Sequence, residues 1–250
     1  MKNLNLRILE ADFVRYRRFK FRYKETIVTI LAEEERYYDV AVEAIIEARK
    51  EIEEAIKMDP QFQITLEPMD CDGNVIGRMC RASKLANVGP MATVAGVIAQ
   101  YAVERMVESG ANFAVVDNGG DIAMFLDRPV TVGIFTYDLT LGMRIEHEGF
   151  YAVCTSSGTI GHSISFGFAD ASTIFAEDAC VADAFATALG NMIREDFGKE
   201  EIERVLESFY AKAKRWVDGA LVIKGKVIGM VGRIPKLVKA DVKPELITRG

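Results

Sequence analysis

One segment restricts the possible folds of this chain more than any other: residues 180–190, which read CVADAFATALG. Alanine and other apolar residues dominate it, so a helix formed here would be apolar on nearly every side and should be largely buried. Asp183 and Thr187 are four residues apart, which places them on one face of that helix, one turn apart. A buried carboxylate needs a partner, either a cation, an arginine or several hydrogen-bond donors. The sequence therefore predicts a buried helix that carries a polar site.

Two interpretations of this polar pair are open. In the first, Asp183 and Thr187 supply oxygen ligands to Mg²⁺, which accepts one carboxylate alongside hydroxyl, carbonyl, water or phosphate oxygens. In the second, backbone N–H groups or an arginine hold Asp183, and the Thr187 hydroxyl bonds back to the Asp183 carbonyl. The spacing alone favours neither.

The rest of the chain predicts alternating groups of strands and helices. The clearest helix covers residues 34–58, where apolar side chains recur at helical spacing. Further helices are expected at 91–109, 178–193 and 200–216, and strands or hairpins at 19–32, 113–116, 122–126, 129–135, 150–154, 172–175 and 220–228. Residues 61–90 look irregular because they are rich in turn formers, and the tail from residue 236 looks loose.

The order of these elements indicates the fold class. Strands come in runs with helices between the runs, and strict βαβ alternation is absent. This pattern favours an α+β fold, with mixed or antiparallel sheets covered by helices, over a doubly wound parallel sheet. No linker is visible, so residues 1–250 are expected to form a single domain, and a division into two intimate lobes stays open.

Charge and hydropathy exclude some classes of function. A net charge of −6 does not favour binding to nucleic acid, and the basic residues at 15–24 alternate with aromatic residues as in an amphipathic strand. No segment is long and apolar enough to span a bilayer, and the N-terminus has no leader signature, which predicts a cytoplasmic protein without a membrane partner. Four cysteines are few for a disulfide scaffold. Whether the chain forms a homo-oligomer stays open.

Three segments rich in glycine or small polar residues are candidates for a ligand-binding cleft. The first contains Gly89, Ala92 and Thr93 at an expected helix start. Free N–H groups and the positive end of the helix dipole suit an anion there, and small side chains let a phosphate come close. The alternative is a helix start that packs tightly against a sheet.

The second segment reads Asn118-Gly119-Gly120-Asp121 and lies between two apolar runs. Asn-Gly in this setting is a strong hairpin signal, so a plain tight turn explains it. In the functional alternative, the glycine N–H groups lie at the mouth of a sheet and Asp121 holds a ribose or adenine group.

The third segment follows an expected strand and is rich in hydroxyl groups; it contains Thr155, Ser156, Ser157 and Gly158 and ends at His162. Such a loop can bind a phosphate through backbone and side-chain donors, although no Lys and no helix follow it as in a P-loop. His162 is a candidate proton carrier, and a structural hydrogen-bonding role is its alternative.

Taken in order, these segments resemble the ApbE family of flavin transferases. The family's Gly-Gly-Ile-Ala-Lys-Gly helix start is matched by residues 89–94, and its Asn-x-Gly-Gly-Asp turn is similar to residues 118–121. Its Thr-Ser-Gly loop resembles residues 155–158, and its metal-binding Ala-Asp-Ala-Leu-Ala-Thr-Ala-Leu helix resembles residues 182–189. The match covers residues 85–193, and the order of the motifs is more specific than any one of them.

The resemblance implies a fold, a ligand and a reaction. Members of the family transfer FMN from FAD to Ser or Thr residues of acceptor proteins with Mg²⁺, so it implies a nucleotide cleft that binds FAD or a related nucleotide and an acceptor protein as partner. Asp183 and Thr187 would be metal ligands, with the Ala92 carbonyl as a third. The chain departs from the family at Thr93, where the family has Lys, and after His162, where the Asp, Pro and Thr of the family stretch are missing. It therefore fits better with a shorter cytoplasmic branch of the superfamily.

Three functions are consistent with these observations. The first is Mg²⁺-dependent transfer or hydrolysis of FAD or a related nucleotide, and the second is binding of such a ligand without catalysis. The third is a thiol-based sulfur-handling protein, which would use Cys154 beside the hydroxyl-rich loop and Cys180 at the start of the metal-binding helix. The alternative for both cysteines is that they are small buried residues.

Overall fold

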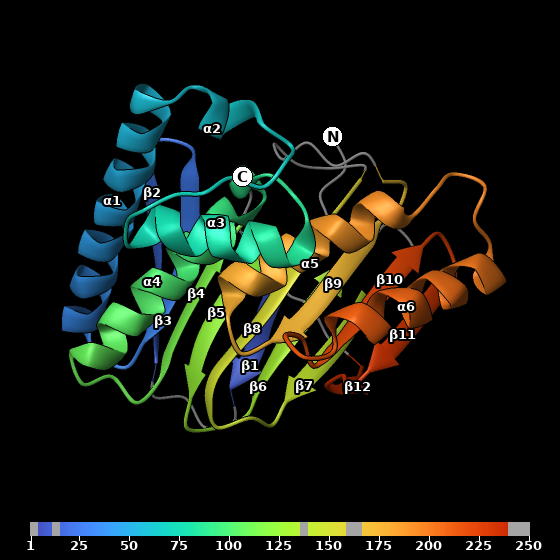
Figure 1. The fold of residues 1–250 in the computed structure, drawn as a ribbon. Helices are drawn as coiled ribbons and strands as arrows, with labels where there is room; N and C mark the ends of the chain where they lie inside the picture. Colours follow the sequence, from blue (N-terminus) through green and yellow to red (C-terminus); the bar gives the residue numbers. More distant parts are fainter. Residues whose placement is uncertain (1–4, 12–15, 136–139, 159–166, 240–250) are drawn as a thin grey trace.

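The computed structural model describes residues 5–11, 16–135, 140–158 and 167–239, which form three layers (Figure 1). An eight-stranded sheet lies in the middle, helices cover one of its faces, and a four-stranded sheet covers the other. The paired strands of both sheets are antiparallel. The expected α+β class, with antiparallel sheets covered by helices, is therefore confirmed.

The division of the strands between the two sheets brings distant segments of the chain together. The central sheet has the order β11-β10-β9-β8-β5-β4-β3-β2 and consists of β2 Arg17–Tyr23, β3 Thr26–Ala32, β4 Ala114–Asn118, β5 Asp121–Leu126, β8 Gly149–Ser156, β9 Ala171–Ala176, β10 Gly219–Lys224 and β11 Val227–Gly232. The smaller sheet has the order β1-β6-β7-β12 and consists of β1 Asn5–Ala11, β6 Val130–Phe135, β7 Thr140–Ile145 and β12 Lys236–Val238. Because β6 and β7 belong to the smaller sheet, β5 and β8 become neighbours, and the turn before β5 lies next to the end of β8.

Side chains alternate between the two faces of the central sheet, and each face has its own hydrophobic core. In β4, Val115 packs in the core that the two sheets share, whereas Val116 packs in the core under the helices. In β8, Val153 and Cys154 alternate in the same way. The Cys154 side of β8 therefore faces the helical layer.

The helical layer consists of α1 Glu35–Met58, α2 Gln61–Ile64, α3 Val75–Ala86, the 3-10 turn η1 Pro90–Thr93, α4 Val94–Glu108, α5 Ala179–Met192 and α6 Lys199–Ala213. α4 packs on β4 and β5, α5 packs on β8 and β9, and the two helices contact each other. α5 is buried along most of its length, as its apolar sequence predicts. It begins after Asp178, whose carboxylate accepts a hydrogen bond from the Val181 N–H at 2.9 Å. Among the described residues, no helix has the length and apolar character that crossing a membrane requires.

The expectation of an irregular stretch over residues 61–90 is wrong, because α2 and α3 lie within it. The turn formers at residues 72–74 end directly before α3, so they precede a helix instead of continuing a loop. Glu51 of α1 completes the start of α3, since its Oε1 accepts hydrogen bonds from the N–H groups of Val75 at 2.8 Å and Ile76 at 3.1 Å. A side chain distant in sequence therefore satisfies the first amides of α3.

Several shorter features also differ from the sequence-based expectation. Cys71 and Cys80 form a disulfide bond with their Cα atoms 5.8 Å apart, which the low cysteine count does not suggest. The helix expected at 91–109 begins as the 3-10 turn η1 and becomes α-helical only at Val94. The strands β1 and β7 have no counterpart among the expected elements, and the tail from Lys236 contributes the short strand β12 at the edge of the smaller sheet.

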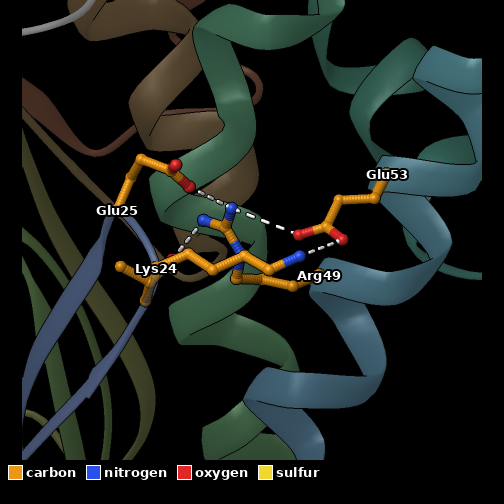
Figure 2. A network of polar contacts seen from close by, with 5 residues as sticks. Lys24, Glu25, Arg49 and Glu53 are labelled. Carbon is orange, nitrogen blue, oxygen red and sulfur yellow. Dashed lines mark hydrogen bonds and ion pairs between the residues drawn. The ribbon is translucent and has the colours of Figure 1, made fainter.

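A network of charged side chains fixes the β2–β3 hairpin to α1 (Figure 2). The Arg49 guanidinium lies between two carboxylates and contacts Glu25 at 2.5 Å and Glu53 at 3.4 Å. Its other nitrogen donates to the Thr26 hydroxyl at 2.7 Å, and Lys24 in the hairpin turn contacts Glu53 at 2.5 Å. Along β2, Arg17, Lys20 and Arg22 are exposed, whereas the aromatic residues between them are partly buried, as the amphipathic strand pattern predicts.

Candidate functional site

The candidate site lies where the turn between β4 and β5, the end of β8 and the start of α4 meet α5. Gly119 and Gly120 form the turn with φ angles of +70° and +110°, a region that favours glycine. Apart from adjacent residues, no atom of the described part of the chain lies within 4 Å of the place that a Cβ would take at either glycine. The Gly120 N–H donates a hydrogen bond to Asp117 Oδ1 at 3.1 Å. The turn predicted from Asn-Gly is confirmed, and its outer side is open.

Asp121 begins β5 directly after this turn and lies opposite Cys154 of β8 in the strand register. Its Oδ1 accepts a hydrogen bond from the Thr155 N–H at 3.2 Å. The pKa of Asp121 is raised from its ordinary value of 3.8 to about 7, mainly by burial and against the opposing effect of the neighbouring Cys154 thiol and the Thr155 N–H. This carboxyl group therefore titrates near neutral pH.

Asp183 lies on the buried face of α5, and only 9% of the residue is exposed. Its Oδ2 accepts a hydrogen bond from the Gly96 N–H at 2.9 Å, and the Ala95 N–H also bonds to the carboxyl group. Both amides belong to the first turn of α4 and have no partner within their own helix. Burial, followed by the charge of Asp121, raises the pKa of Asp183 well above its ordinary value. Backbone donors thus hold this carboxylate, as in the second interpretation of the sequence, and Thr187 is buried one turn further along α5.

The start of α4 is connected to the glycine turn as well as to α5. The Asn118 Nδ2 donates a hydrogen bond to the Ala95 carbonyl at 3.1 Å, while the N–H of the same alanine bonds to Asp183. Ala95 therefore joins the turn before β5 to Asp183 near the start of α5. The helix start, the glycine turn and the Asp183 helix meet at one place.

Two residues of the first predicted segment, Gly89 and Thr93, are tightly packed. A Cβ on Gly89 would lie 2.0 Å from the Thr65 carbonyl oxygen, so a larger residue would clash with the chain after α2. Thr93 is fully buried, and its hydroxyl donates to the Pro90 carbonyl at 2.8 Å within η1. Packing therefore explains these two residues, whereas Ala92 keeps its candidate role as a carbonyl ligand.

The hydroxyl groups of the third segment divide between the two faces of the sheet. Thr155 follows the face that packs on the smaller sheet, and its hydroxyl pairs with that of Thr173 in β9 at 2.8 Å. Ser156 and its register partner Ser172 lie on the helical face. Both of these hydroxyl oxygens are buried, and neither has a hydrogen-bond partner among the described residues. Because an unpaired buried hydroxyl costs roughly 1–3 kcal/mol, the serine pair is a candidate subsite for a hydrogen-bonding ligand.

The end of the third segment packs against the chain at residues 167–169. The Gly158 N–H donates to the Ala169 carbonyl at 3.1 Å, and a Cβ on Gly158 would lie 1.6 Å from the Gly167 carbonyl oxygen. Ser157 beside it is buried. His162, the predicted proton carrier, lies outside the described residues.

This arrangement can be compared with known proteins. A family model with the description "AbpE bacteria" matches residues 10–215 of the chain. The chain belongs to this ApbE-like family. The UPF0280 protein of Archaeoglobus fulgidus is 54% identical, over 94% of this chain and 100% of that protein. The resemblance expected from the order of the motifs is therefore confirmed.

Solved structures of ApbE proteins have the same architecture. A mutant of the flavin transferase ApbE from Vibrio cholerae matches with a TM-score of 0.58 and 13% identity, over 88% of this chain and 97% of that chain. The ApbE protein of Thermotoga maritima matches with a TM-score of 0.56 and 13% identity, over 94% of this chain and 100% of that chain. At these identities the likeness establishes the fold, and the activity of this ApbE-like chain has to be argued from its site.

The oxygen atoms of the ApbE-like site fit a hard divalent cation. The described residues contain no group of three His, Cys, Asp or Glu that could hold a metal, so a cation would depend on one or two carboxylates plus hydroxyl and carbonyl oxygens. Asp121 and Asp183 are acids with raised pKa values, and no basic side chain of the described part contributes to either shift. Mg²⁺ in proteins is usually bound by one or two carboxylates and completes its shell with water or phosphate oxygens. The residues present therefore fit this ion.

The cysteines of the ApbE-like chain do not suit thiol chemistry. Cys154 donates its thiol hydrogen to the Ala179 carbonyl at 3.4 Å, and both it and Cys180 are buried. Burial raises the pKa of both thiols well above the ordinary value, so little thiolate forms at neutral pH. Cys71 and Cys80 are joined in the disulfide bond. These observations favour small buried residues over a sulfur carrier.

Two residues at this site carry little signal in the sequence. Gln100 of α4 accepts a hydrogen bond from the Ala179 N–H at 3.0 Å, and Ser172 lies beside Ser156. The one available signal for Gln100 is a polar side chain one turn after Gly96 in a helix start of small and apolar residues. Ser172 becomes visible only when the register between β8 and β9 is known.

Proposed function

We propose that this protein binds a pyrophosphate-containing nucleotide together with Mg²⁺, with FAD as the first candidate. The pair of acids Asp121 and Asp183 carries the proposal, because the charge of one raises the pKa of the other inside a buried site. Two interacting carboxyl groups, of which Asp183 is buried and Asp121 is partly buried, are costly unless they share a proton or a cation. A divalent cation would remove this cost and leave coordination positions for phosphate oxygens.

The candidate metal ligands are Asp183, Thr187 and the Ala92 carbonyl. Bound Mg²⁺ would supply positive charge to neutralise the pyrophosphate. The chain itself contributes a carboxylate that the first turn of α4 holds in place, through the Gly96 N–H at 2.9 Å. Such fixed positioning lowers the cost of ordering the site when a ligand binds.

The ligand would lie along the open side of the glycine turn and the end of β8. Gly119 and Gly120 leave free space where other residues would have a side chain, so a phosphate or ribose can approach the backbone closely. The Ser156 and Ser172 hydroxyls are the candidate donors on the helical face. Asp121 is a candidate acceptor for a ribose or adenine group, which was its expected role.

The finer proposal is Mg²⁺-dependent flavin transfer or nucleotide hydrolysis. In this reaction the pyrophosphate bond of FAD breaks, FMN passes to a Ser or Thr hydroxyl of an acceptor protein or to water, and AMP leaves. His162 is the candidate carrier of the hydroxyl proton. Membership of the ApbE-like family and the flavin transferase activity named for its solved relatives support this step.

Binding without turnover is the second candidate function. One observation favours it: Thr93 stands where the ApbE family resemblance expects Lys, and its hydroxyl is engaged with the Pro90 carbonyl. A buried threonine tied into a turn provides no positive charge for a phosphate.

Calorimetry with FAD, FMN and ATP, each with and without Mg²⁺, tests the binding proposal. We expect FAD to bind in the presence of Mg²⁺ and to lose that affinity in Asp183→Asn, which keeps the shape of the side chain but removes its charge. Equal binding of FAD to both proteins would contradict the proposed site. Chromatography of the same mixtures for AMP and FMN, with and without an acceptor peptide, then separates catalysis from binding alone.

A further inference from the structure

Helices α4 and α5 cap each other, and each capping side chain lies one turn beyond the capped amide of its own helix. Asp183 of α5 accepts a hydrogen bond from the Gly96 N–H in the first turn of α4, at 2.9 Å. Gln100 of α4 accepts one from the N–H of Ala179, the first residue of α5, at 3.0 Å. The amides of a first helical turn have no intrahelical acceptor, so each helix satisfies an orphan donor of the other. The two capping side chains are each four residues beyond the amide that their own helix contributes.

The backbones of the two helices touch at this crossing. A Cβ on Gly96 would lie 2.2 Å from the Ala179 carbonyl oxygen and 2.8 Å from the Asp183 Cβ. The same Ala179 carbonyl accepts the Cys154 thiol at 3.4 Å. The first residue of α5 is therefore held by α4 through its N–H and by β8 through its carbonyl. Because Asp183 is one turn away on a rigid helix, whatever fixes Ala179 also fixes that carboxylate.

Gln100 is itself held in one orientation. Only 5% of the residue is exposed, and its Nε2 donates to Glu104 Oε1 at 3.1 Å. The other Glu104 oxygen accepts a hydrogen bond from Arg78 of α3 at 2.5 Å. With its amide nitrogen committed to the glutamate, Gln100 presents its oxygen to Ala179. A continuous series of contacts thus runs from α3 through α4 to the start of α5.

We propose that Gln100 is a positioning residue for Asp183, which it places for cation binding by fixing the first turn of α5. This inference rests on the proposed function, because it assumes that Asp183 is a metal ligand. Gln100 does not touch the cation and acts through the Ala179 N–H. Residues that orient a metal ligand from outside its coordination shell typically change metal affinity by roughly 10–100-fold when removed.

The test measures Mn²⁺ affinity of the full chain by electron paramagnetic resonance, with melting temperature as a second readout. Gln100→Met keeps the approximate shape of the side chain but removes both hydrogen bonds, and we expect it to weaken Mn²⁺ binding by about 10-fold. Ile45→Val, in α1, a helix that supplies no residue to the site, is the control for lost stability alone. It should lower the melting temperature without changing Mn²⁺ affinity.

The outcomes separate this inference from the proposed function. If Asp183→Asn binds Mn²⁺ as well as the wild type does, the proposed metal site is wrong and the role of Gln100 falls with it. If Asp183→Asn loses binding while Gln100→Met retains the wild-type affinity, only the inference about Gln100 is overturned. Should Gln100→Met fail to fold, Glu104→Met is the second variant. Glu104 is partly exposed, and its replacement removes the hydrogen bond that orients the Gln100 amide. Unchanged Mn²⁺ affinity in Glu104→Met would overturn the inference.

Discussion

Asp121 and Asp183 are the residues whose charge state is most sensitive to their surroundings. Asp121 follows a glycine turn at the edge of the site, and Asp183 lies deeper, on α5. Burial raises the pKa of both carboxyl groups, and the charge of Asp121 adds to the effect at Asp183. The site therefore keeps protons that exposed carboxyl groups would lose, and it should release them when a cation binds.

Stability should fall with rising pH because of Asp121. Its pKa is about 7 in the folded chain, against an ordinary value of 3.8, so the native state binds more protons than the unfolded state between these values. The free energy of unfolding should therefore decrease as pH rises from about 4 to about 7 and level off above, by a total on the order of 4 kcal/mol for this residue. Chemical denaturation at pH 5 and pH 8 measures the change.

Asp121→Asn is the matched control for this pH dependence. It removes the titrating group, so its stability should change less between pH 5 and pH 8 than that of the wild type. Mg²⁺ should raise the melting temperature of the wild type more at pH 8, where the carboxyl groups are ionised, than at pH 5. An identical pH profile for wild type and variant would show that Asp121 is not the source of the effect.

Gly96 should not tolerate even the smallest side chain. In Gly96→Ala the added Cβ would lie 2.2 Å from the Ala179 carbonyl oxygen, so α4 and α5 must move apart. Such overpacking costs about 1–3 kcal/mol, and because it displaces the amide that holds Asp183, Mn²⁺ binding should weaken as well. Thermal denaturation and metal titration of the same variant measure both effects.

Gly77→Ala provides the contrast within the helical layer. Gly77 lies inside α3, and the nearest atom to an added Cβ is the end of the flexible Arg81 side chain at 3.3 Å. This substitution should leave stability unchanged or raise it by up to about 1 kcal/mol, because alanine favours the helix. If both substitutions lower the free energy of unfolding by the same amount, the contact between α4 and α5 is less tight than the structure shows.

At the residue scale, sequence patterns predict positions better than they predict contacts. The four-residue spacing of Asp183 and Thr187 predicts that both are buried on one helical face, and the structure confirms it. The partners of Asp183 do not follow from the sequence, because Gly96 is 87 positions away and only folding brings its amide to the carboxylate. Gln100 is equally hidden, since its acceptor role depends on where α5 begins.

At the scale of elements, α3 depends on tertiary contacts that the local sequence does not predict. Its first amides bond to Glu51 of α1, and the disulfide bond between Cys71 and Cys80 ties it to the preceding chain. Because turn formers precede α3, the local sequence predicts a loop there instead of a helix. By contrast, α1 and α5 are predicted well, because long periodic or apolar runs leave few alternatives. Short edge strands such as β12 need a partner strand to be recognised.

Reduction of the disulfide bond should loosen α3 without removing the site. The bond closes a short loop, since its cysteines are 9 positions apart. Its loss should lower the free energy of unfolding by about 2–3 kcal/mol, which denaturation with and without reductant measures. The double variant Cys71→Ala, Cys80→Ala should be as stable as the reduced wild type and should not respond to reductant. Equal stability of oxidised and reduced wild type would contradict this role.

At the scale of the whole molecule, the layered arrangement is what assembles the site. The smaller sheet takes β6 and β7 out of the central sheet, so β5 and β8 pair and bring Asp121 next to Thr155 (Figure 1). The helical layer then adds α4 and α5 on the same face. Antiparallel sheets covered by helices could be predicted from the order of elements, but the division of strands between two sheets could not, because both kinds of strand show similar sequence patterns.

A crystal structure of the full chain grown with Mn²⁺ and FAD, with anomalous diffraction to locate the metal, tests the central claim most directly. We predict an anomalous peak within coordination distance of the Asp183 carboxylate and the Thr187 hydroxyl, with the pyrophosphate of FAD bound to the same ion beside the turn at Gly119. A peak elsewhere, or FAD bound away from Asp183 while backbone amides alone occupy its carboxylate, would contradict it.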